Sequence, residues 1–323
     1  MKQTTFLSDS DNNLNVCARA LSNGELVAFP TETVYGLGAI ANCDSAVAAI
    51  FEAKKRPSFN PLIVHVSSIS DAKKIVQFNE RAEELAASFW PGALTMVLPR
   101  LNDCGISLLV SAGLDSIAIR VPTHPLAQKL LAKTAHPIAA PSANRSGEIS
   151  PTTAAHVVRS FSQISMQHNI IILDGGACEV GLESSVVDLT GEQSVLLRPG
   201  GVTSESIEAV IGELKFAASE NCAPKSPGML SRHYAPKTPL RLNAHSINEG
   251  ELLLGFGPTQ QKVTFNLSES GNLVQAAANL FAMLHDLDLK TPSGIAVMPI
   301  PLEGLGLAIN DRLKRAISPK TEN

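Results

Sequence analysis

The sequence has little cysteine, and none of it has the spacing of a metal site. Five cysteines occur in 323 residues, and no two of them form a Cys-x-x-Cys pair. Because they are odd in number and far apart, neither a zinc site nor a disulfide framework is predicted. No acidic metal-binding cluster occurs either. We therefore expect no metal ion that the protein binds by itself.

Long apolar runs and a strong excess of one charge are also missing. No apolar stretch approaches the roughly 18 residues of a membrane-spanning helix. The N-terminal MKQTTFLSDSDNN has no apolar centre like that of a secretory signal. We therefore expect a cytoplasmic protein with no membrane partner. The net charge of −4 argues against a surface that grips nucleic acid all over, although a local basic patch stays compatible with it.

Common nucleotide-binding and hydrolase signatures are absent as well. The chain has no G-x-x-x-x-G-K-[ST] loop, no protein-kinase signature, no H-E-x-x-H and no nucleophile elbow. Gly304-Leu305-Gly306 lacks the third glycine of a dinucleotide fingerprint, so we interpret it as a packing turn. The composition, 44% hydrophobic and 17% charged, is that of an ordinary soluble protein. Its length suffices for two domains.

What the sequence does contain is a polar loop after a buried strand. The apolar run ELVAF (25–29) predicts a strand that stops at Pro30. Hydroxyl and carboxylate groups follow on Thr31, Glu32, Thr33 and Tyr35. Such a loop, ending in Gly-Leu-Gly at 36–38, can bring backbone and polar side chains close to a ligand. A plain strand-to-helix turn is the alternative.

A second polar loop follows a short strand predicted at 138–140. It reads PSANRSG (141–147), and Ser150-Pro151-Thr152-Thr153 then opens a helix that runs through Phe161. In open α/β sheets, ligands lie at the carboxyl ends of strands. We therefore expect the loops after Phe29 and after Ala140 to share one site.

Basic residues occur where a charge needs a partner. Arg120 stands among apolar residues in a strand predicted at 116–121, where an unpaired charge would be very costly. Its partner is either an acidic side chain of the protein or a ligand carboxylate or phosphate. His65, in the strand 62–66, is either a satisfied core group or a ligand contact. Basic residues end the helix predicted at 45–55, where helix-end stabilisation explains one or two of them.

The remaining pattern alternates helices and strands, which predicts an α/β fold. Asp44 is expected to cap the helix at 45–55. Other helices are predicted at 12–23, 80–89, 124–134 and 204–211. Other strands are predicted at 94–98, 106–110, 170–173 and 195–198, and the hydroxyl pair within 181–189 leads into a further one.

A proline-containing stretch divides the chain. We predict a first domain over 1–215, a linker over 216–238 and a small α/β domain over 239–323. The linker contains SPGMLSRHYAP (226–236), which has too much Arg, His and Tyr for a passive tether. We interpret it as a lid that folds over a site. The last domain has strands predicted at 240–242, 251–256, 263–265 and 294–300, and helices at 272–287 and 305–317.

Nine motifs together resemble the YrdC/Sua family of threonylcarbamoyl-AMP synthases, in its long two-domain form. In order they are FPTETVYGLG, KKRPSFNPLIVHV, FWPGALTMVL, IAIRVP, APSANRSGEISPT, ESSVVDL, LLRPGG, SPGMLSRHYAPKTPL and GLGLAINDRLKRA. They extend from residue 29 to about 315. Each motif alone is weak, whereas the ordered set with the linker motif is highly specific.

The resemblance implies a twisted, open, mixed α/β sheet with a positively lined concave face, followed by a second, smaller α/β domain. It implies a nucleotidyltransferase that condenses L-threonine, bicarbonate and ATP into threonylcarbamoyl-AMP and releases pyrophosphate, with Mg²⁺ arriving on the ATP. The product would pass to a tRNA threonylcarbamoyl-transferase complex that modifies the adenosine beside the anticodon. A weak contact of this protein with tRNA is left open.

The resemblance also implies roles for single residues. Lys54 and Arg56 match the family's Lys-x-Arg pair and are expected to be catalytic. L-Threonine would be held by Thr33, His65, Arg120 and Ser184, with Arg120 binding its carboxylate in a bidentate fork. The expected nucleotide contacts are Arg56, Asn60, Ser116, Ser142, Asn144, Ser150, Arg198 and Tyr234. Ser184 and Ser185 are neighbours on a predicted strand, so the choice between them is open.

Two other functions are alternatives. One is an RNA-binding or ribosome-maturation module with a basic concave face, against which the acidic net charge and the loop chemistry argue. The other is a carbamoyl-transfer domain for a different substrate, but the zinc-finger cysteines and the acylphosphatase region of such proteins are lacking.

Overall fold

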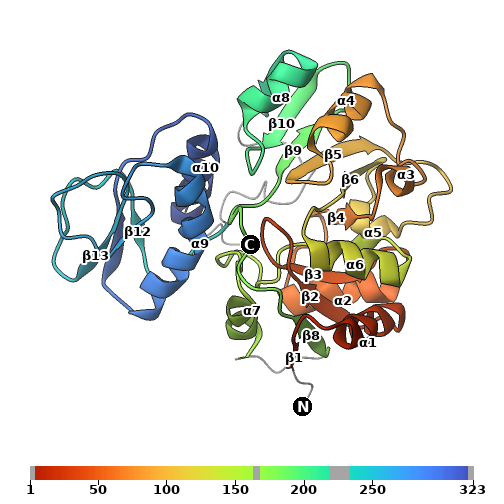
Figure 1. Ribbon diagram of the computed structural model, residues 1–323, viewed down its shortest axis with the longest axis horizontal. Coiled ribbons are helices and arrows are strands. Elements are labelled where there is room, and N and C mark those ends of the chain that lie inside the picture. The colour runs from red at the N-terminus through yellow and green to blue at the C-terminus, as the bar shows by residue number, and fades with distance from the viewer. Residues whose placement is uncertain (1–3, 163–167, 218–232, 319–323) are drawn as a thin grey trace.

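The structure, a computed structural model, is built around two sheets of unequal size (Figure 1). It describes residues 4–162, 168–217 and 233–318. The larger sheet has 11 strands and the smaller has four. Helices pack against both sheets, so the predicted α/β architecture with a second, smaller α/β domain is confirmed.

The elements of the larger domain come first along the chain. Its strands are β1 (Thr4–Leu7), β2 (Leu26–Phe29), β3 (Gly36–Ile40), β4 (Ile63–His65), β5 (Leu94–Pro99), β6 (Ser116–Arg120), β7 (Ile138–Ala139), β8 (Ile170–Leu173), β9 (Ser185–Asp188), β10 (Ser194–Arg198) and β11 (Leu214–Phe216). Its helices are α1 (Asp11–Ser22), α2 (Asp44–Lys54), α3 (Ile69–Ala72), α4 (Glu80–Phe89), α5 (Leu108–Ser111), α6 (Pro125–Thr134), α7 (Ala154–Phe161) and α8 (Ser204–Ile211).

The smaller domain contains β12 (Leu240–Arg241), β13 (Glu251–Gly255), β14 (Phe265–Asn266), α9 (Leu273–Leu289), β15 (Gly294–Val297) and α10 (Leu305–Ile317). Its strands are all parallel, in the order β12-β15-β13-β14. The larger sheet is mixed and has the order β1-β8-β2-β3-β7-β4-β6-β5-β9-β10-β11. β11 extends one residue past the boundary predicted at 215, and residues 218–232 of the predicted linker lie outside the described residues.

Several helices begin at residues suited to capping. Ser10, Asn79, Thr153 and Thr203 each accept a backbone N–H at the start of α1, α4, α7 and α8. The cap expected for α2 is wrong. Cys43 holds that position without a side-chain hydrogen bond, and Asp44 lies inside the first turn, where a carboxylate interacts favourably with the helix dipole.

The strand expected at 106–110 is also wrong. Ser107 accepts the N–H of Leu109, and the chain forms the short helix α5 from Leu108. A short apolar run does not by itself distinguish a strand from a helical turn, and here the serine cap decides for the helix. β1, α3 and β11 were not predicted.

The polar loop after β2 is shorter than expected, because β3 already begins at Gly36. β2 and β3 form an antiparallel hairpin in which Phe29 pairs with Gly36. Gly38 packs so closely that a Cβ there would lie 2.8 Å from the side chains of Phe29 and Ile138. Glycine in a strand often marks such a close approach, so the Gly-Leu-Gly segment belongs to the sheet and not to the loop.

The two polar loops meet, as predicted. β2 and β7 are both antiparallel to β3, so they run in the same direction and end at the same edge. The N–H of Leu37 donates to the carbonyl of Pro141 at 2.8 Å, and the N–H of Ala143 donates to the carbonyl of Tyr35 at 2.8 Å. Residues 30–35 and 141–147 therefore form one continuous wall.

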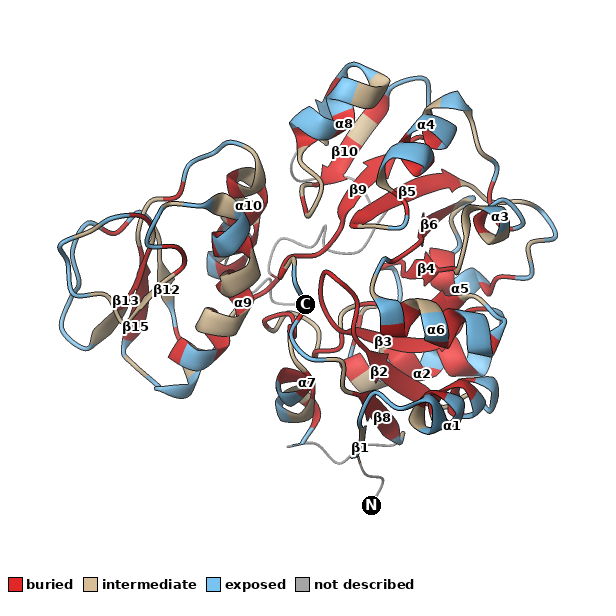
Figure 2. Cartoon of the chain, viewed as in Figure 1, coloured by how far each residue is buried: buried red, intermediate tan, exposed pale blue. Residues whose placement is uncertain are grey.

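The smaller domain shares a hydrophobic core with the larger one. α9 and α10 lie on the side of the small sheet that faces the larger domain (Figure 1). Their apolar side chains pack in one buried cluster with Val34, Ile149 and Leu182. Figure 2 shows that each of the two helices has buried residues. Gly181 has φ +71°, and a Cβ there would lie 2.5 Å from the Cα of Ala278 in α9. The two domains are thus in close contact beside the polar loops.

Candidate active site

A pocket lies beside the joined loops, over one face of the larger sheet. Ile63 and His65 both line it and stand two residues apart on β4, so they share a face. The other lining residues are Thr31, Thr33, Val34, Gly36, Arg56, Arg120, Ala140, Pro141, Ser142, Glu183, Ser184, Arg198, His233 and Tyr234. β4 runs antiparallel to β7, so the carboxyl ends of these two strands lie at opposite edges of the sheet. The pocket, which receives residues from β4 and from the segment after β7, is therefore not confined to one carboxyl edge.

Thr31 holds the loop after β2 in shape. Its Oγ1 donates to the carbonyl of Val34 at 2.6 Å and accepts the N–H groups of Thr33 and Val34, both at 3.2 Å. Such local side-chain hydrogen bonds replace the ladder bonds that a strand would offer. The Thr33 hydroxyl then lies 2.8 Å from that of Thr31 and faces Arg120.

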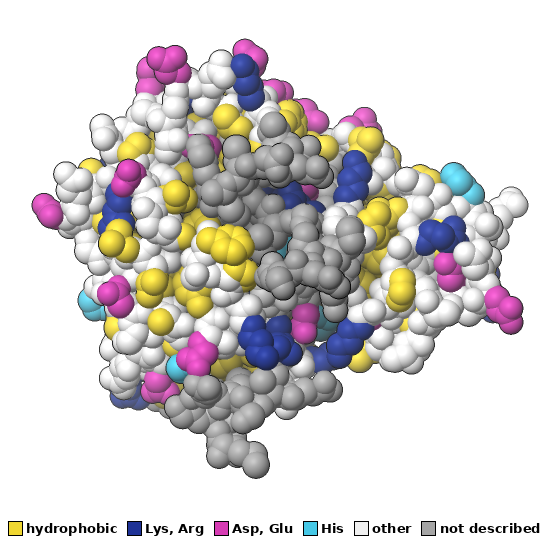
Figure 3. Space-filling view, turned by 180° about the vertical axis from the view of Figure 1, so that it is seen from behind, with side chains coloured by type: hydrophobic (Ala, Val, Ile, Leu, Met, Phe, Trp, Pro, Cys, Tyr) yellow, Lys and Arg dark blue, Asp and Glu magenta, His cyan; other side chains and the backbone are white. Residues whose placement is uncertain are grey.

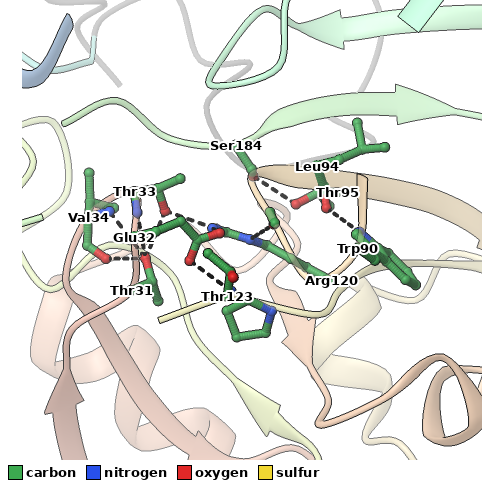
Figure 4. A network of polar contacts seen from close by, with 12 residues as sticks. Thr31, Glu32, Thr33, Val34, Trp90, Leu94, Thr95, Arg120, Thr123 and Ser184 are labelled. Carbon is green, nitrogen blue, oxygen red and sulfur yellow. Dashed lines mark hydrogen bonds and ion pairs between the residues drawn. The ribbon is translucent and has the colours of Figure 1, made fainter. Parts of the chain in front are cut away.

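Arg120 pairs with an acidic side chain of the protein (Figure 4). Its Nη2 donates to Oε1 of Glu32 at 2.5 Å, and its Nη1 donates to the Thr33 hydroxyl at 2.9 Å. Nε donates to the carbonyl of Gly92 at 3.0 Å. The sequence left open whether the partner of Arg120 is an acidic side chain of the protein or an anionic group of a ligand. In the structure it is an acidic side chain, Glu32. Three of the five N–H groups of an arginine are used in this way, and the other two have no partner among the described residues.

His65 lines the pocket as a neutral imidazole. Burial lowers the pKa of His65 to about 3, and neighbouring Arg120 adds to the shift. Its Nδ1 has no hydrogen-bond partner within the part of the chain that the structure describes. The ring packs edge-on against Phe29, with the centroids 6.2 Å apart. His65 is therefore both a core residue and a pocket residue.

Of the two neighbouring serines, Ser184 lines the pocket. Its Oγ lies 2.7 Å from the hydroxyl of Thr95 and accepts from Nη2 of Arg198 at 3.3 Å. The Ser185 hydroxyl donates instead to the carbonyl of Val202. Ser184 directly precedes β9, and neighbouring side chains of an extended chain point to opposite faces, so only Ser184 of the two lines the pocket.

The predicted cations lie at different depths. Arg56 and Arg198 line the pocket, and burial lowers the pKa of Arg56 to about 9. Arg56 donates to the backbone carbonyls of Asn60 and Pro61. Arg198 donates to the carbonyl of Ser184. The acceptors of Arg56 in these contacts are neutral, so an anion beside Arg56 would meet positive charge.

Lys54 lies behind the pocket rather than in its lining. Its Nζ donates to the carbonyl of Ser142 at 2.5 Å and to that of Asn144. Burial, together with the charge of Arg56, holds the pKa of Lys54 well below its usual range. The lysine expected to be catalytic thus binds the backbone of the second loop in this structure.

Three other predicted residues also lie behind the wall. Asn144 donates to the carbonyls of Arg145 and Glu148, and the Ser150 hydroxyl donates to Glu183. Asn60 is completely buried, and neither atom of its amide has a partner within residues 4–162, 168–217 and 233–318. A buried amide without partners is costly, so a contact from a bound molecule or water would satisfy it.

Ser116 is not brought to the pocket. It begins β6, which ends at Arg120, so it stands about 13 Å from Arg120 at 3.3 Å per strand residue. Its backbone pairs with Pro99 at the far end of β5. The nucleotide contact expected at Ser116 is therefore not supported by its position.

Two titratable residues of the pocket were not predicted as site residues. Glu183 lines the pocket and accepts Nε of Arg312 at 2.9 Å. Burial alone would raise the pKa of Glu183, but Arg312 and Arg198 hold it below its usual range. His233, also buried, packs on Tyr234 with the ring centroids 4.0 Å apart. In the sequence, only their places within the motifs ESSVVDL and SRHYAP could have identified these two residues. No hydrophobic periodicity marks either of them.

Only the end of the predicted lid belongs to the described chain. Residues 226–232 lie outside the described residues, whereas His233 and Tyr234 line the pocket. Tyr234 has φ +64°, an uncommon conformation for a residue with a side chain. Its ring stacks on Phe281 of α9, with the centroids 5.7 Å apart. Packing by the C-terminal domain therefore holds Tyr234 at the site.

Among the residues described, no group of three or more His, Cys, Asp or Glu side chains is placed to hold a metal ion. A search of the same residues finds no helix that is both long and apolar enough to cross a membrane.

The chain is similar to known proteins over nearly its full length. A family model for Sua5, YciO and YrdC proteins, described as telomere recombination, matches residues 19–200. A second model, the C-terminal domain of threonylcarbamoyl-AMP synthase, matches residues 202–318. The threonylcarbamoyl-AMP synthase of Bacillus subtilis is 42% identical, with 97% of this chain and 95% of that protein covered. That of Pyrococcus abyssi is 41% identical, covering 94% and 93%.

A solved structure agrees with these relatives. The crystal structure of P. abyssi Sua5 complexed with L-threonine has a TM-score of 0.88 and 38% sequence identity, and the match covers 97% of each chain. Both domains of the present structure are therefore those of its relatives. The chain belongs to the Sua5 family of threonylcarbamoyl-AMP synthases, in its two-domain form.

Proposed function

We propose that this enzyme condenses L-threonine, bicarbonate and ATP into threonylcarbamoyl-AMP at the pocket beside Tyr234, with release of pyrophosphate. One observation carries the proposal. Thr33, His65, Arg120 and Ser184, expected to bind threonine, line the same pocket as the nucleotide candidates Arg56, Ser142, Arg198 and Tyr234. Amino acid and nucleotide would therefore meet in one place, which the condensation requires.

Threonine would bind at the wall formed by Thr33, Arg120 and Ser184. The two N–H groups of Arg120 that lack a partner among the described residues would receive its carboxylate. Glu32, which pairs with Arg120, repels that carboxylate but attracts the ammonium group of the same amino acid. The pair Arg120–Glu32 thus suits a zwitterion better than a simple anion. His65 and Ser184 offer uncharged hydrogen-bonding groups for the threonine hydroxyl.

The nucleotide would bind on the side of Arg56, Ser142 and Arg198. Carbamate attack on the α-phosphorus brings two anions together, and fixed cations lower the cost of that approach. At about 4 Å and an effective dielectric near 20, each cation–anion contact is worth roughly 4 kcal/mol before desolvation. Arg56 and Arg198 are both buried, so these contacts would be little screened by salt. Lys54, through its bonds to Ser142 and Asn144, would hold the second loop for the phosphates.

Magnesium would enter bound to ATP, as part of that substrate. Asn60, Asn144 and Ser150 do not line the pocket and would support, from behind, the residues that bind the nucleotide. The cytoplasmic location, the transfer of the product to a tRNA threonylcarbamoyl-transferase complex and a weak tRNA contact stay predictions from the sequence. On the face seen in Figure 3, acidic side chains lie interspersed with basic ones, whereas an RNA-binding module needs a basic stripe.

The test is pyrophosphate release by the purified protein with magnesium–ATP. We expect release to require both L-threonine and bicarbonate. Release that needs neither would show that the chain is a different nucleotide-using enzyme. Salt-sensitive RNA binding without any turnover would favour the RNA-binding module instead.

A further inference from the structure

Arg312 reaches from the C-terminal domain into the wall of the pocket. It lies on α10, and its side chain is only 1% exposed. Nε donates to Oε2 of Glu183 at 2.9 Å, and Nη1 donates to the carbonyl of Pro199 at 2.6 Å. Both acceptors belong to the larger domain. One guanidinium therefore joins the two domains by charge-assisted hydrogen bonds.

Both acceptors are neighbours of pocket residues in the chain. Glu183 itself lines the pocket and precedes Ser184, while Pro199 follows Arg198. The two segments run so close together that a Cβ on Gly200 would lie 2.4 Å from the carbonyl oxygen of Glu183. Binding both segments to one rigid, planar group fixes the spacing between Ser184 and Arg198.

Arg312 also contacts Tyr234, which lines the pocket. Its Cζ lies 5.2 Å from the ring centroid of Tyr234, which is within the range of a cation–π contact. Phe281 of α9 packs against the same ring. Asp311 accepts Nη1 at 2.9 Å, so its carboxylate adds to that of Glu183 in balancing the buried charge. Side chains of the C-terminal domain thus hold this wall of the pocket from behind.

We propose that Arg312 is a positioning residue of the active site: by binding Glu183, Pro199 and Tyr234 together, it sets the relative places of Ser184, Arg198 and the tyrosine ring. The C-terminal domain then shapes the pocket in addition to carrying the linker. The chemistry of that pocket rests on the proposed function. The competing explanation is that Arg312 only neutralises the buried carboxylate of Glu183 and stabilises the interface.

These two roles can be separated because of how buried ion pairs behave. Removing one partner leaves an uncompensated charge and destabilises a protein, whereas replacing both partners by uncharged groups is often neutral. The variants are Arg312→Met and the double variant Glu183→Gln/Arg312→Met, made in the full chain. Arg241→Met is the matched control, because Arg241 forms a close pair with Glu251 in the same domain and does not line the pocket.

Three quantities are measured: the thermal midpoint, kcat/KM for pyrophosphate release with L-threonine varied, and hydrogen exchange of residues 182–187 and 196–202. We expect Arg312→Met to lower both the midpoint and kcat/KM. The double variant should recover the midpoint. Because Glu183 itself lines the pocket, the double variant is compared with Glu183→Gln alone, and its kcat/KM should stay about ten- to a hundredfold below that of Glu183→Gln, since a displacement near 1 Å can cost that much. Both segments should exchange faster in both variants, and Arg241→Met should change neither kcat/KM nor exchange.

Turnover that returns together with the midpoint in the double variant would overturn the proposal, because Arg312 would then be only a counter-charge. Wild-type kcat/KM in Arg312→Met would overturn it as well. If the wild-type protein releases no pyrophosphate at all, the proposed function fails, and hydrogen exchange alone decides on Arg312. Faster exchange of the two segments would support the positioning role in that case, and unchanged exchange would refute it.

Discussion

The cations of the pocket differ in what holds them. Arg120 is held by the carboxylate of Glu32, whereas Arg56 donates to backbone carbonyls. A carbonyl orients a cation but does not neutralise it. The positive charge of Arg56 therefore attracts a ligand anion more strongly. Arg120 is balanced by Glu32, so this pair suits a substrate that carries both a positive and a negative charge.

This difference predicts that the two arginines serve different substrates. Arg120→Ala alone would leave Glu32 buried and unpaired, which destabilises the fold, so the variant to use is Glu32→Gln/Arg120→Met. We expect its KM for L-threonine to rise roughly 10- to 100-fold, the value of one or two hydrogen bonds to a charged group. Its KM for ATP should change much less. The measurement is steady-state pyrophosphate release with each substrate varied in turn.

Arg56→Met is the matched comparison and should raise the KM for ATP more than that for threonine. Glu32→Gln alone reports the contribution of the carboxylate. Equal effects of the arginine variants on both substrates would contradict the assignment of Arg120 to the threonine carboxylate.

At the scale of single residues, motif matches identified the pocket better than patterns did. Eight predicted residues line it, among them His65, Arg120 and Tyr234. Ser184 and Ser185 could not be told apart in the sequence, because adjacent strand residues differ only in the face they reach. Ser116 is four residues before Arg120 in the chain, but it lies at the other end of β6 and does not line the pocket.

Among the elements, the joined loops after β2 and β7 were predicted from polar runs that follow apolar ones. What the pattern did not show is β3, which begins at Gly36 and lies between β2 and β7. The Gly-Leu-Gly segment has the composition of a turn, but close packing against Phe29 and Ile138 requires small residues there. Tertiary packing thus overrides the local signal of the glycines.

A substitution at Gly181, which packs against α9, tests the contact between the domains. Gly181→Ala places a Cβ against the backbone of α9, within 2.6 Å of the carbonyls of Ala277 and Ala278, and it also strains a residue at φ +71°. We expect a loss of roughly 1–3 kcal/mol of unfolding free energy, as is usual for overpacking. Urea unfolding measures it, together with pyrophosphate release.

Gly212→Ala is the matched control, because Gly212 has φ +76° and nothing within 4 Å of its Cβ position. It carries the backbone strain without the clash. A loss for Gly181→Ala no larger than that for Gly212→Ala would mean that α9 moves aside at no cost, and that the domain contact is loose.

At the scale of the whole molecule, uncharged histidines are buried in both domains and between them. Burial is the first cause that lowers the pKa of His65, His233 and His285 to about 3 and that of His156 to about 4. His156 of α7 stacks on His285 of α9 across the domain contact, with the centroids 4.0 Å apart. A proton on either ring would place a charge in this interface.

These histidines predict how stability changes with pH. In the unfolded chain a histidine titrates near 6.5, so between about pH 6.5 and 4.5 the unfolded state binds protons that the folded state does not. The free energy of unfolding should therefore fall as the pH is lowered through this window, by up to about 1.4 kcal/mol per pH unit for each histidine, and be nearly constant from pH 7 to 8. Urea unfolding at several pH values measures the slope.

His285→Gln should reduce that slope by about one proton, because glutamine can still bond the carbonyl of Ser150 but does not titrate. A stability that is independent of pH across the window would show that these imidazoles are protonated in the folded protein or reach water.

The sequence by itself determined the type of fold, most of the helices and strands, and the family, because these depend on local periodicity, capping residues and ordered motifs. Only the tertiary structure decided that Arg120 is paired with Glu32, that Ser184 rather than Ser185 lines the pocket, and that Lys54 holds the second loop. It alone showed the contact of Arg312 with Glu183 across 129 positions of the chain. The physical reason is that partners of buried charges are chosen by distance in space, which no local pattern encodes.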